Sequence, residues 1–488
     1  MLQKTGIALL TGASLAISAC VTAAPPPQLA AEEPYLFEPR NGDRVEAFKG
    51  TFEVPENRAD PNSRMITLGY VRFPSTNPNP GAPIVYLAGG PGGTGVGTAQ
   101  GRRFPLFMKL RGVADVIAFD QRGTGLSNHL QDCETDLAYP LDKPLFEDAI
   151  TALYQHAARQ CKEFWAANDN DISAYNTLES ARDLDDLRAA LGAEKINLWS
   201  ISYGTHLAMA AVKIMDERVD RIVMTGAEGL HQTVKLPKRT DEFYGRIQSA
   251  IDQDPAAKAV YPDIAAMMRR VHAKLDADPA VVEIEGEGGA PITLVFGKAD
   301  MQLLSAFSSA DPRNVAQVLA LYLAVDARQY EPAAALLYRY LRSGTLELSP
   351  MSTAMDIASG ISDDRLALVR EQAKAGLVGS FLNFPMPHIK DALPELDLGE
   401  EFRSLPYSNT PTLLLTGMLD GRTYPDSQAE AVAGFSDVTQ IYVENAGHNL
   451  FMSDPEIGER IFQFLSGEQV SEGTIVLPLP DFTAPLQN

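Results

Sequence analysis

Three residues of types that act together in nucleophilic hydrolysis stand far apart in this chain. Ser202 follows the apolar run 196–201 and precedes a helix-like run. Asp420 and His448 each follow a later apolar segment typical of a buried strand. A serine attacks a carbonyl carbon when a histidine takes its proton and a carboxylate holds that histidine in place. The residue types and their order therefore predict a triad of Ser202, Asp420 and His448.

Each of these residues taken alone has an ordinary structural explanation. Ser202 would serve as a helix N-cap, Asp420 as an acidic turn residue and His448 as a loop histidine. His206 lies one helical turn beyond Ser202, and we expect it to pack on the helix. Only the three together, each after a strand, distinguish the catalytic interpretation from the structural one.

The elements that would position the triad alternate between strands and helices. Strand-like runs that end in turns lie within 83–95, 114–127, 194–209, 219–229, 410–421 and 438–449. Residues 177–192 have helical apolar spacing, and residues 49–73 suggest antiparallel strands. This alternation predicts an α/β fold with a doubly wound, mostly parallel sheet. Helical patterns dominate from about 230 to 405, which predicts a helical cap inserted between two sheet segments.

The N-terminus has the pattern of an export signal. Lys4 precedes an apolar run, and Ala19 precedes Cys20. The sequence Ile-Ser-Ala-Cys resembles the lipobox of bacterial lipoproteins, in which the cysteine is acylated and becomes the new N-terminus. The alternative is an ordinary signal peptide cut after Ala19 or near Ala24, with Cys20 incidental. The predicted segments are a signal peptide at 1–19, a tether at 20–34, the first part of the core at 35–229, the cap at 230–405 and the second part of the core at 406–488.

Composition narrows the classes of partner. The chain has 488 residues and a formal net charge of −22, which disfavours binding to nucleic acids and to anionic lipid. Besides Cys20 there are two cysteines, Cys133 and Cys161, which would bridge in an oxidising compartment or remain as two buried thiols. No third ligand lies at metal-binding spacing near them. We expect no metal and no cofactor.

Hydrolysis also needs donors for the oxyanion. The backbone N–H of Tyr203, just after the nucleophile, is the first candidate. The glycine-rich loop Ala-Gly-Gly-Pro-Gly-Gly supplies the second, for which we predict Gly90. A phosphate-binding loop is the competing interpretation, but the Gly-Lys-Ser/Thr ending of that motif is absent.

Several motifs resemble one branch of the α/β-hydrolases. The motifs are GGPGG, DQRGTGLS, SYGT, GMLDGRT and AGHN, and together they resemble serine peptidases of the proline iminopeptidase and tripeptidyl-aminopeptidase-like family. VPENRADPNSRMITL and YNTLESARDLDDLRAALG resemble the tripeptidyl-type members more closely. The resemblance covers roughly 45–230 and 400–455. Ala88 stands where proline iminopeptidases often carry histidine, and Ser200 replaces the first glycine of the G-x-S-x-G elbow; serine adds little bulk there.

The resemblance implies an α/β-hydrolase fold and an aminopeptidase that acts through an acyl-enzyme on Ser202. Such an enzyme releases single residues or short peptides from the free N-terminus of peptide substrates. Family members of the proline iminopeptidase type hold the substrate ammonium with acidic residues near the cap, and Glu228 could do this here. The alternative for Glu228 is a surface glutamate in a loop.

Two other functions remain open at this stage. The same triad would serve an esterase or amidase of small molecules, because a fold does not fix the substrate. The other is a non-enzymatic lipoprotein that binds peptides or acts as an envelope scaffold, on a hydrolase fold that has lost its catalytic activity. The signal predicts an exported protein of the bacterial cell envelope, facing the periplasm and touching the membrane only through the lipid anchor. Val21 after Cys20 favours the outer membrane. The oligomeric state is not predicted.

Overall fold

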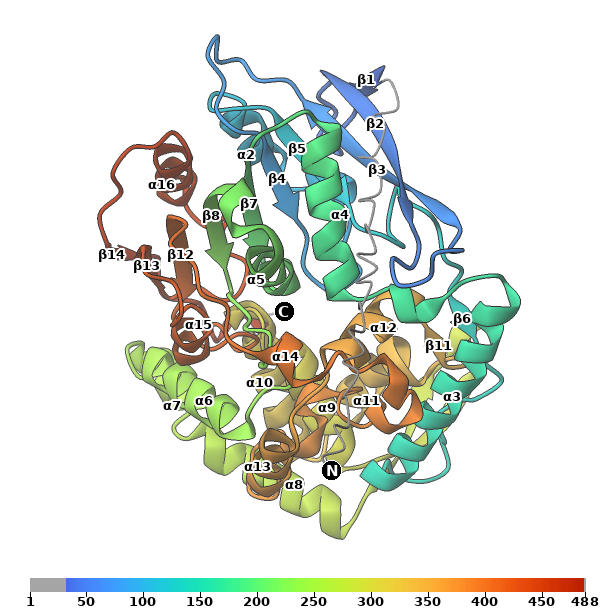
Figure 1. The fold of residues 1–488 in the computed structure, drawn as a ribbon. Coiled ribbons are helices and arrows are strands. Elements are labelled where there is room, and N and C mark those ends of the chain that lie inside the picture. Colours follow the sequence, from blue (N-terminus) through green and yellow to red (C-terminus); the bar gives the residue numbers. More distant parts are fainter. Residues whose placement is uncertain (1–31, 487–488) are drawn as a thin grey trace, which may run out of the picture.

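A ten-stranded sheet lies beside a large helical block in the computed structural model, which describes residues 32–486 (Figure 1). The predicted signal peptide, Cys20 and most of the tether lie outside the described residues. In their order across the sheet the strands are β1 (Glu33–Phe37), β2 (Val45–Pro55), β3 (Met65–Phe73), β5 (Val116–Asp120), β4 (Ile84–Leu87), β7 (Ile196–Ile201), β8 (Val219–Thr225), β12 (Thr412–Gly417), β13 (Val438–Glu444) and β14 (Gly473–Val476).

The sheet is antiparallel at one end and parallel elsewhere. The pairs β1–β2, β2–β3 and β3–β5 are antiparallel, and every later pair from β5 to β14 is parallel. Strands β4, β7 and β12 are buried along their whole length. Continuous apolar runs of this kind are typical of parallel strands that are covered on both faces. The predicted mostly parallel, doubly wound sheet is therefore confirmed.

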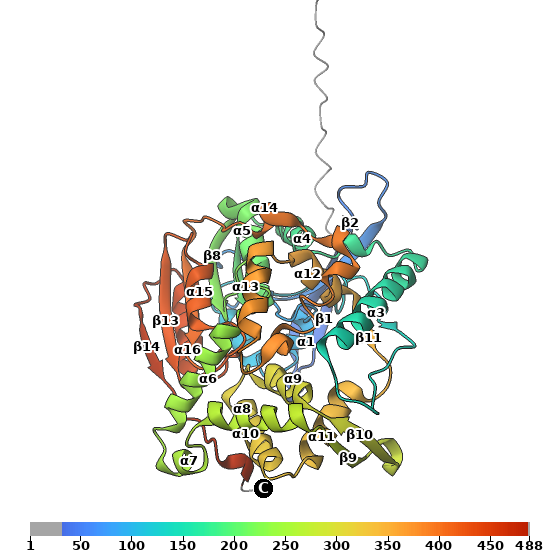
Figure 2. The ribbon, with the colours of Figure 1, turned by 90° about the horizontal axis from the view of Figure 1, so that it is seen from below.

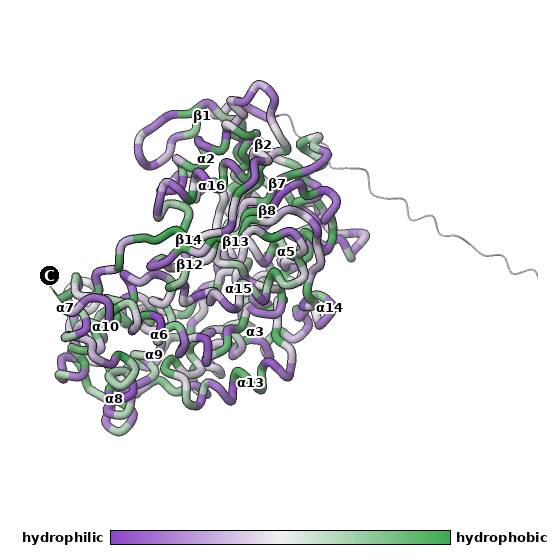
Figure 3. Tube along the Cα trace, turned by 90° about the vertical axis from the view of Figure 1, so that its left-hand side faces the viewer, coloured by the Kyte–Doolittle hydropathy of each residue, from purple (hydrophilic) through white to green (hydrophobic). Residues whose placement is uncertain are grey.

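Helices cover both faces of the sheet through two separate hydrophobic clusters. One cluster packs the sheet against α4 (Thr177–Ala190), α5 (Tyr203–Met215) and α15 (Pro425–Ala431). The other packs it against α2 (Phe104–Leu110) and α16 (Pro455–Leu465). Figure 3 shows hydrophobic residues concentrated in the interior near β7. The carboxyl ends of the parallel strands therefore open toward the remaining side, where the helical block lies.

The helical block lies between β8 and β12 in sequence, as the periodicity predicts. Its helices are α6 (Pro237–Ile251), α7 (Pro255–Val260), α8 (Ile264–Ala277), α9 (Lys298–Ser308), α10 (Pro312–Asp326), α11 (Glu331–Leu337), α12 (Pro350–Ser359), α13 (Asp363–Ala373) and α14 (Gly399–Arg403). The block also contains an antiparallel hairpin of β9 (Ala280–Glu285) and β10 (Pro291–Phe296), which the helical pattern did not predict. We call this block the cap.

A segment that sequence analysis placed in the first part of the core contributes to the cap instead. The strand β6 (Cys133–Glu134) pairs antiparallel with β11 (Glu347–Leu348) of the cap. The following helix α3 (Glu147–Ala167) lies beside β11 (Figure 2). A disulfide joins Cys133 to Cys161. The apolar face of α3 is buried in the same cluster as the cap helices, which is why this part of 35–229 leaves the sheet.

The end of the chain also reaches the cap. After β14 the chain leaves the sheet, and Phe482 is fully buried in the cap cluster. The predicted second part of the core, 406–488, therefore includes a tail that packs on the cap. Within residues 32–486 no helix is both long enough and apolar enough to cross a lipid bilayer.

Candidate active site

Ser202 lies at the sharp turn between β7 and α5. Its backbone has φ 54° and ψ −130°, an unusual conformation for a residue with a side chain. The Ser202 N–H donates a hydrogen bond of 3.0 Å to the carbonyl of Thr225 on the neighbouring strand β8, which fixes the turn. A strained strand-to-helix turn of this kind lifts the serine hydroxyl above the edge of the sheet. The local structure therefore fits an exposed nucleophile.

The residues two positions before and after Ser202 show why this turn accepts only small side chains. A Cβ atom at Gly204 would lie only 2.2 Å from the carbonyl oxygen of Leu87, so the helix start approaches β4 too closely for any side chain. Ser200 is fully buried, and its hydroxyl donates 2.8 Å to the carbonyl of Val223. The serine that replaces the usual elbow glycine thus has a satisfied hydroxyl in the tight turn.

Asp420 and His448 are brought together by the turns that follow β12 and β13. The Nδ1 atom of His448 lies 2.8 Å from Oδ2 of Asp420. Asp420 also accepts hydrogen bonds from the backbone N–H groups of Arg422 (2.7 Å) and Thr423 (2.9 Å) and from the Thr423 hydroxyl (2.8 Å). Burial alone would raise the pKa of Asp420, but His448 and the Thr423 donors lower it below its usual range. The buried carboxylate is therefore held in its charged form next to the imidazole.

Thr423 connects the Asp420–His448 pair to the cavity that Ser202 lines. Its hydroxyl oxygen lies 3.3 Å from Nδ1 of His448, and Thr423 lines the same cavity as Ser202. Gly226, just after β8, also confines the imidazole, since a Cβ atom there would lie 2.6 Å from Cε1 of His448. The imidazole uses Nδ1 for Asp420, which leaves Nε2 for a second partner. The structure thus joins Asp420 to His448 at the ends of β12 and β13, and the membership of Ser202 in the same triad stays a prediction.

The glycine-rich loop after β4 closes against Ser202. A Cβ atom at Gly89 would lie 3.0 Å from Cβ of Ser202, and Gly90, at φ +127°, lines the cavity together with Tyr203. Tyr203 is the first residue of α5, so its N–H has no partner within the helix. Gly90 and Tyr203 thus line the same cavity as Ser202, and their assignment as oxyanion donors stays a prediction.

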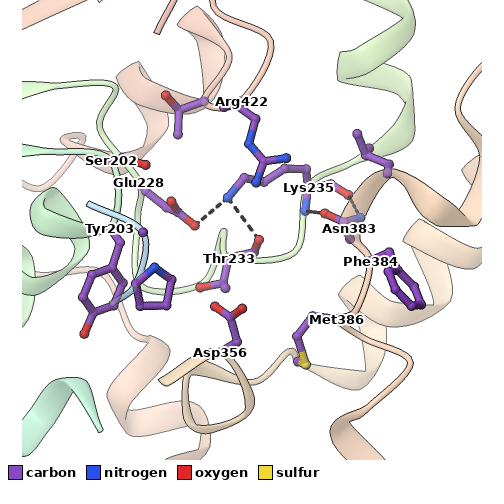
Figure 4. A pocket seen from close by; sticks show the side chains of 14 residues that line it. Ser202, Tyr203, Glu228, Thr233, Lys235, Asp356, Asn383, Phe384, Met386 and Arg422 are labelled. Carbon is purple, nitrogen blue, oxygen red and sulfur yellow. Dashed lines mark hydrogen bonds and ion pairs between the residues drawn. The ribbon is translucent and has the colours of Figure 1, made fainter. Parts of the chain in front are cut away.

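The cavity beside Ser202 has a volume of about 80 Å³ and carries four charged side chains (Figure 4). Glu228 forms an ion pair of 2.5 Å with Nζ of Lys235. Lys235 also donates 3.0 Å to the carbonyl of Thr233. Asp356 from α12 and Arg422 from the turn after β12 complete the set. Sequence analysis predicted Glu228 at this place but not its cationic partner.

Burial sets the protonation of these groups. It raises the pKa of Asp356 to about 7, and the nearby Glu228 adds to the shift, whereas Lys235 and Arg422 oppose it. Burial lowers the pKa of Lys235, and Glu228 partly restores it. Perturbed titrating groups in a cavity next to a nucleophile are characteristic of functional sites.

Three charged residues of the cavity escaped sequence analysis, namely Asp356, Lys235 and Arg422. Asp356 and Lys235 lie in the cap, where no strand-end rule locates functional residues. Arg422 follows Asp420 by two positions, and that proximity to a predicted triad residue was the one available signal.

His206 takes no part in the cavity, in agreement with the packing role expected for it. It is buried between Ser359 (Nε2 to Oγ, 3.1 Å) and the carbonyl of Gly229 (3.4 Å). Burial lowers its pKa to about 4, so it is neutral at ordinary pH. Among residues 32–486, no group of three His, Cys, Asp or Glu side chains is arranged to hold a metal ion.

Comparisons with known proteins agree with this architecture. Residues 82–455 match the family described as the alpha/beta hydrolase fold. A tripeptidyl aminopeptidase of Streptomyces coelicolor is 27% identical over 314 residues, which cover 59% of this chain and 54% of that protein. Serine protease Hip1 of Mycobacterium tuberculosis is 29% identical over 189 residues, which cover 37% of this chain and 36% of that protein. The chain thus aligns with about half or less of the length of these relatives.

One match among solved structures is at low sequence identity. The proline iminopeptidase of Mycobacterium smegmatis superposes with a TM-score of 0.37 at 15% identity, covering 86% of this chain and 98% of that one.

Proposed function

The chain belongs to the α/β-hydrolase family, and from that premise we propose that it is a serine aminopeptidase acting on short peptides. The observation that carries this proposal is the small cavity beside Ser202, into which two carboxylates, Glu228 and Asp356, are directed. A carboxylate that lines such a cavity pairs with a substrate ammonium and so fixes the distance to the scissile bond.

The Asp420–His448 hydrogen bond and the strained turn at Ser202 support the following reaction. Ser202 Oγ attacks the peptide carbonyl carbon while its proton moves to Nε2 of His448. Asp420, which accepts a hydrogen bond from Nδ1 of His448, holds the imidazole in place and stabilises the imidazolium that forms. The tetrahedral intermediate then breaks its C–N bond, and the imidazolium gives its proton to the leaving amine. Water repeats the sequence on the acyl-enzyme, frees the N-terminal fragment and restores Ser202.

The backbone N–H groups of Tyr203 and Gly90 are proposed to bind the oxyanion of the intermediate. Loss of one such donor typically costs about 3–4 kcal/mol of transition-state stabilisation. The helix N-terminus at Tyr203 adds a partial positive charge at the same point.

The proposed ammonium site consists of Asp356 together with Glu228. Glu228 already pairs with Lys235, whereas among the described residues no hydrogen bond or ion pair of the Asp356 carboxylate is found. A substrate ammonium near Asp356 would compensate the cost of ionising a buried carboxylate. We therefore propose that Asp356 shares with Glu228 the predicted role of holding the substrate ammonium.

The test is a panel of free and N-acetylated peptides of two to four residues. We expect the folded wild type to cleave free peptides from the N-terminus and to lose at least about 100-fold in kcat/KM on acetylation, because a desolvated charge pair is removed. Ser202→Ala is expected to abolish turnover with the unfolding midpoint almost unchanged. Equal rates on free and acetylated peptides would contradict the proposal.

An esterase or amidase is the second candidate, and the Glu228–Lys235 ion pair favours it, because a neutralised Glu228 needs no cationic substrate. Glu228→Gln separates the two. An aminopeptidase loses peptide cleavage selectively, whereas an esterase loses peptide and neutral ester turnover equally or keeps both.

We further propose that the protein is exported and anchored at Cys20. The disulfide between Cys133 and Cys161 supports an oxidising compartment. Mass spectrometry of the mature N-terminus tests this, with an acylated Cys20 expected and a free residue after Ala19 or near Ala24 as the contrary result.

A further inference from the structure

The cation Arg422 is left without a partner in the cavity beside Ser202. Lys235 is engaged by Glu228 (2.5 Å) and by the carbonyl of Thr233 (3.0 Å). Among residues 32–486, the guanidinium of Arg422 has no hydrogen bond or ion pair, although the side chain is largely sheltered. A partly desolvated guanidinium without a partner is unfavourable, and an anionic ligand would relieve it.

The backbone of Arg422 is fixed to the triad. Its N–H donates 2.7 Å to Oδ1 of Asp420, which in turn holds His448. A group bound by this arginine therefore lies at a defined place relative to the reacting centre. Figure 4 shows Arg422 and Asp356 entering the cavity from opposite sides, with Glu228 and Lys235 between them.

We propose that Arg422 binds a carboxylate of the substrate, so that the preferred substrate is a zwitterionic peptide with its ammonium near Asp356 and a carboxylate at Arg422. This inference rests on the proposed aminopeptidase function and names its substrate class. A peptide has two sources of such a carboxylate, namely an acidic side chain and the free C-terminus of a very short peptide.

The chemistry of the cavity favours a carboxylate over other anions. A guanidinium presents a planar pair of N–H donors that matches the two oxygens of a carboxylate. The cavity holds two carboxylates and two cations, so a zwitterion complements its charges better than a multiply charged phosphate does.

The test uses alanine di- to tetrapeptides in which each position in turn is Glu or Gln, each with a free or an amidated C-terminus. For the wild type we expect one carboxylate-bearing peptide to have a kcat/KM at least tenfold higher than its neutral counterpart. A factor of about ten is the effect of one charge-assisted hydrogen bond. A Glu/Gln difference identifies the side chain as the source, and an acid/amide difference identifies the C-terminus.

Arg422→Gln is expected to reduce that ratio to about one, and Arg422→Lys, which keeps the charge without the planar donor pair, to an intermediate value. Circular dichroism and the unfolding midpoint check that both variants are folded. Arg313→Gln is the matched control, because it removes the same charge from an exposed position outside the cavity and should keep the wild-type ratio.

The outcomes separate this inference from the proposed function. Peptide cleavage without any carboxylate preference, or with a preference that survives Arg422→Gln, overturns the role of Arg422 and leaves the aminopeptidase standing. Absence of cleavage of every free peptide by folded wild-type protein overturns both.

Discussion

At the scale of single residues, the acids near Ser202 differ in what surrounds them, and this difference separates their roles. Asp420 accepts several hydrogen bonds, among them one from the Thr423 hydroxyl at 2.8 Å, and it stays charged. Asp356 has the opposite environment, because burial raises its pKa to about 7. A carboxylate with a raised pKa is suited to binding a cationic ligand, because the ligand stabilises its charged form. The carboxylate that holds His448 must instead be charged throughout the proposed reaction.

The raised pKa of Asp356 has a consequence for stability. The unfolded chain releases this proton near pH 4, but the folded protein keeps it until about pH 7. The folded state therefore binds more protons over this interval, and the contribution of Asp356 to the free energy of unfolding falls as pH rises from about 4 to about 7. Above pH 7 the full cost of the buried charge remains.

Asp356→Asn removes that cost, so we expect its unfolding midpoint, relative to wild type, to be about 2 °C or more higher at pH 8 than at pH 5. Differential scanning calorimetry at the two pH values measures the difference. The exposed Asp142→Asn serves as control and should show no such pH dependence. If the difference in unfolding midpoint between Asp356→Asn and wild type is the same at both pH values, the raised pKa of Asp356 is refuted.

At the scale of elements, the ends of parallel strands made the Asp420–His448 pair predictable. Parallel strands bring their carboxyl ends to one edge, so the residues just after β7, β12 and β13 could be placed together from sequence alone. Periodicity could not place α3, because an apolar helix face shows that a partner exists but not which one. Asp356 and Lys235 were missed because a charge in the cap is ordinarily solvent-exposed, and only the folded cap shows them partly buried.

The turn after β8 provides an element-scale prediction. Gly226 has φ +59°, and a Cβ atom there would lie 2.6 Å from Cε1 and 2.8 Å from Nδ1 of His448. Gly226→Ala should displace the imidazole and lower kcat about 100-fold, as a misplacement of about 1 Å does. Gly192→Ala is the matched control, since Gly192 also has a positive φ (+65°), but a Cβ atom there would have no neighbour within 4 Å. Steady-state kinetics of both variants should show the loss only for Gly226→Ala, and equal kcat values would contradict this packing.

At the scale of the whole molecule, the cap is held to the rest of the chain at several points distant in sequence. The disulfide Cys133–Cys161 closes the segment that pairs β6 with β11. Phe482, near the other end of the chain, is buried among the cap residues. These attachments fix α12, and with it Asp356, over the carboxyl edge of the sheet. The cavity is therefore lined by residues of both parts, Ser202 from the sheet and Asp356 from the cap.

Removing the disulfide should weaken this attachment. The two cysteines are 28 residues apart, and freeing a loop of that length in the unfolded chain costs about 3 kcal/mol of folding free energy. We expect the Cys133→Ala/Cys161→Ala variant to unfold at a lower temperature than wild type and to be insensitive to reductant, whereas reductant should lower the wild-type midpoint. Identical midpoints for the two proteins, with and without reductant, would show that the bridge does not stabilise the cap.

The claim on which the account depends is that Ser202 is activated by His448 and Asp420. A fluorophosphonate probe followed by peptide mapping tests it most directly, because the probe reacts with a serine only when a base activates it. We predict stoichiometric labelling of Ser202 in the wild type, no labelling of Ser202→Ala, and labelling slowed at least about 100-fold in His448→Ala. Folded wild-type protein that remains unlabelled, or that is labelled at another serine, would contradict the account.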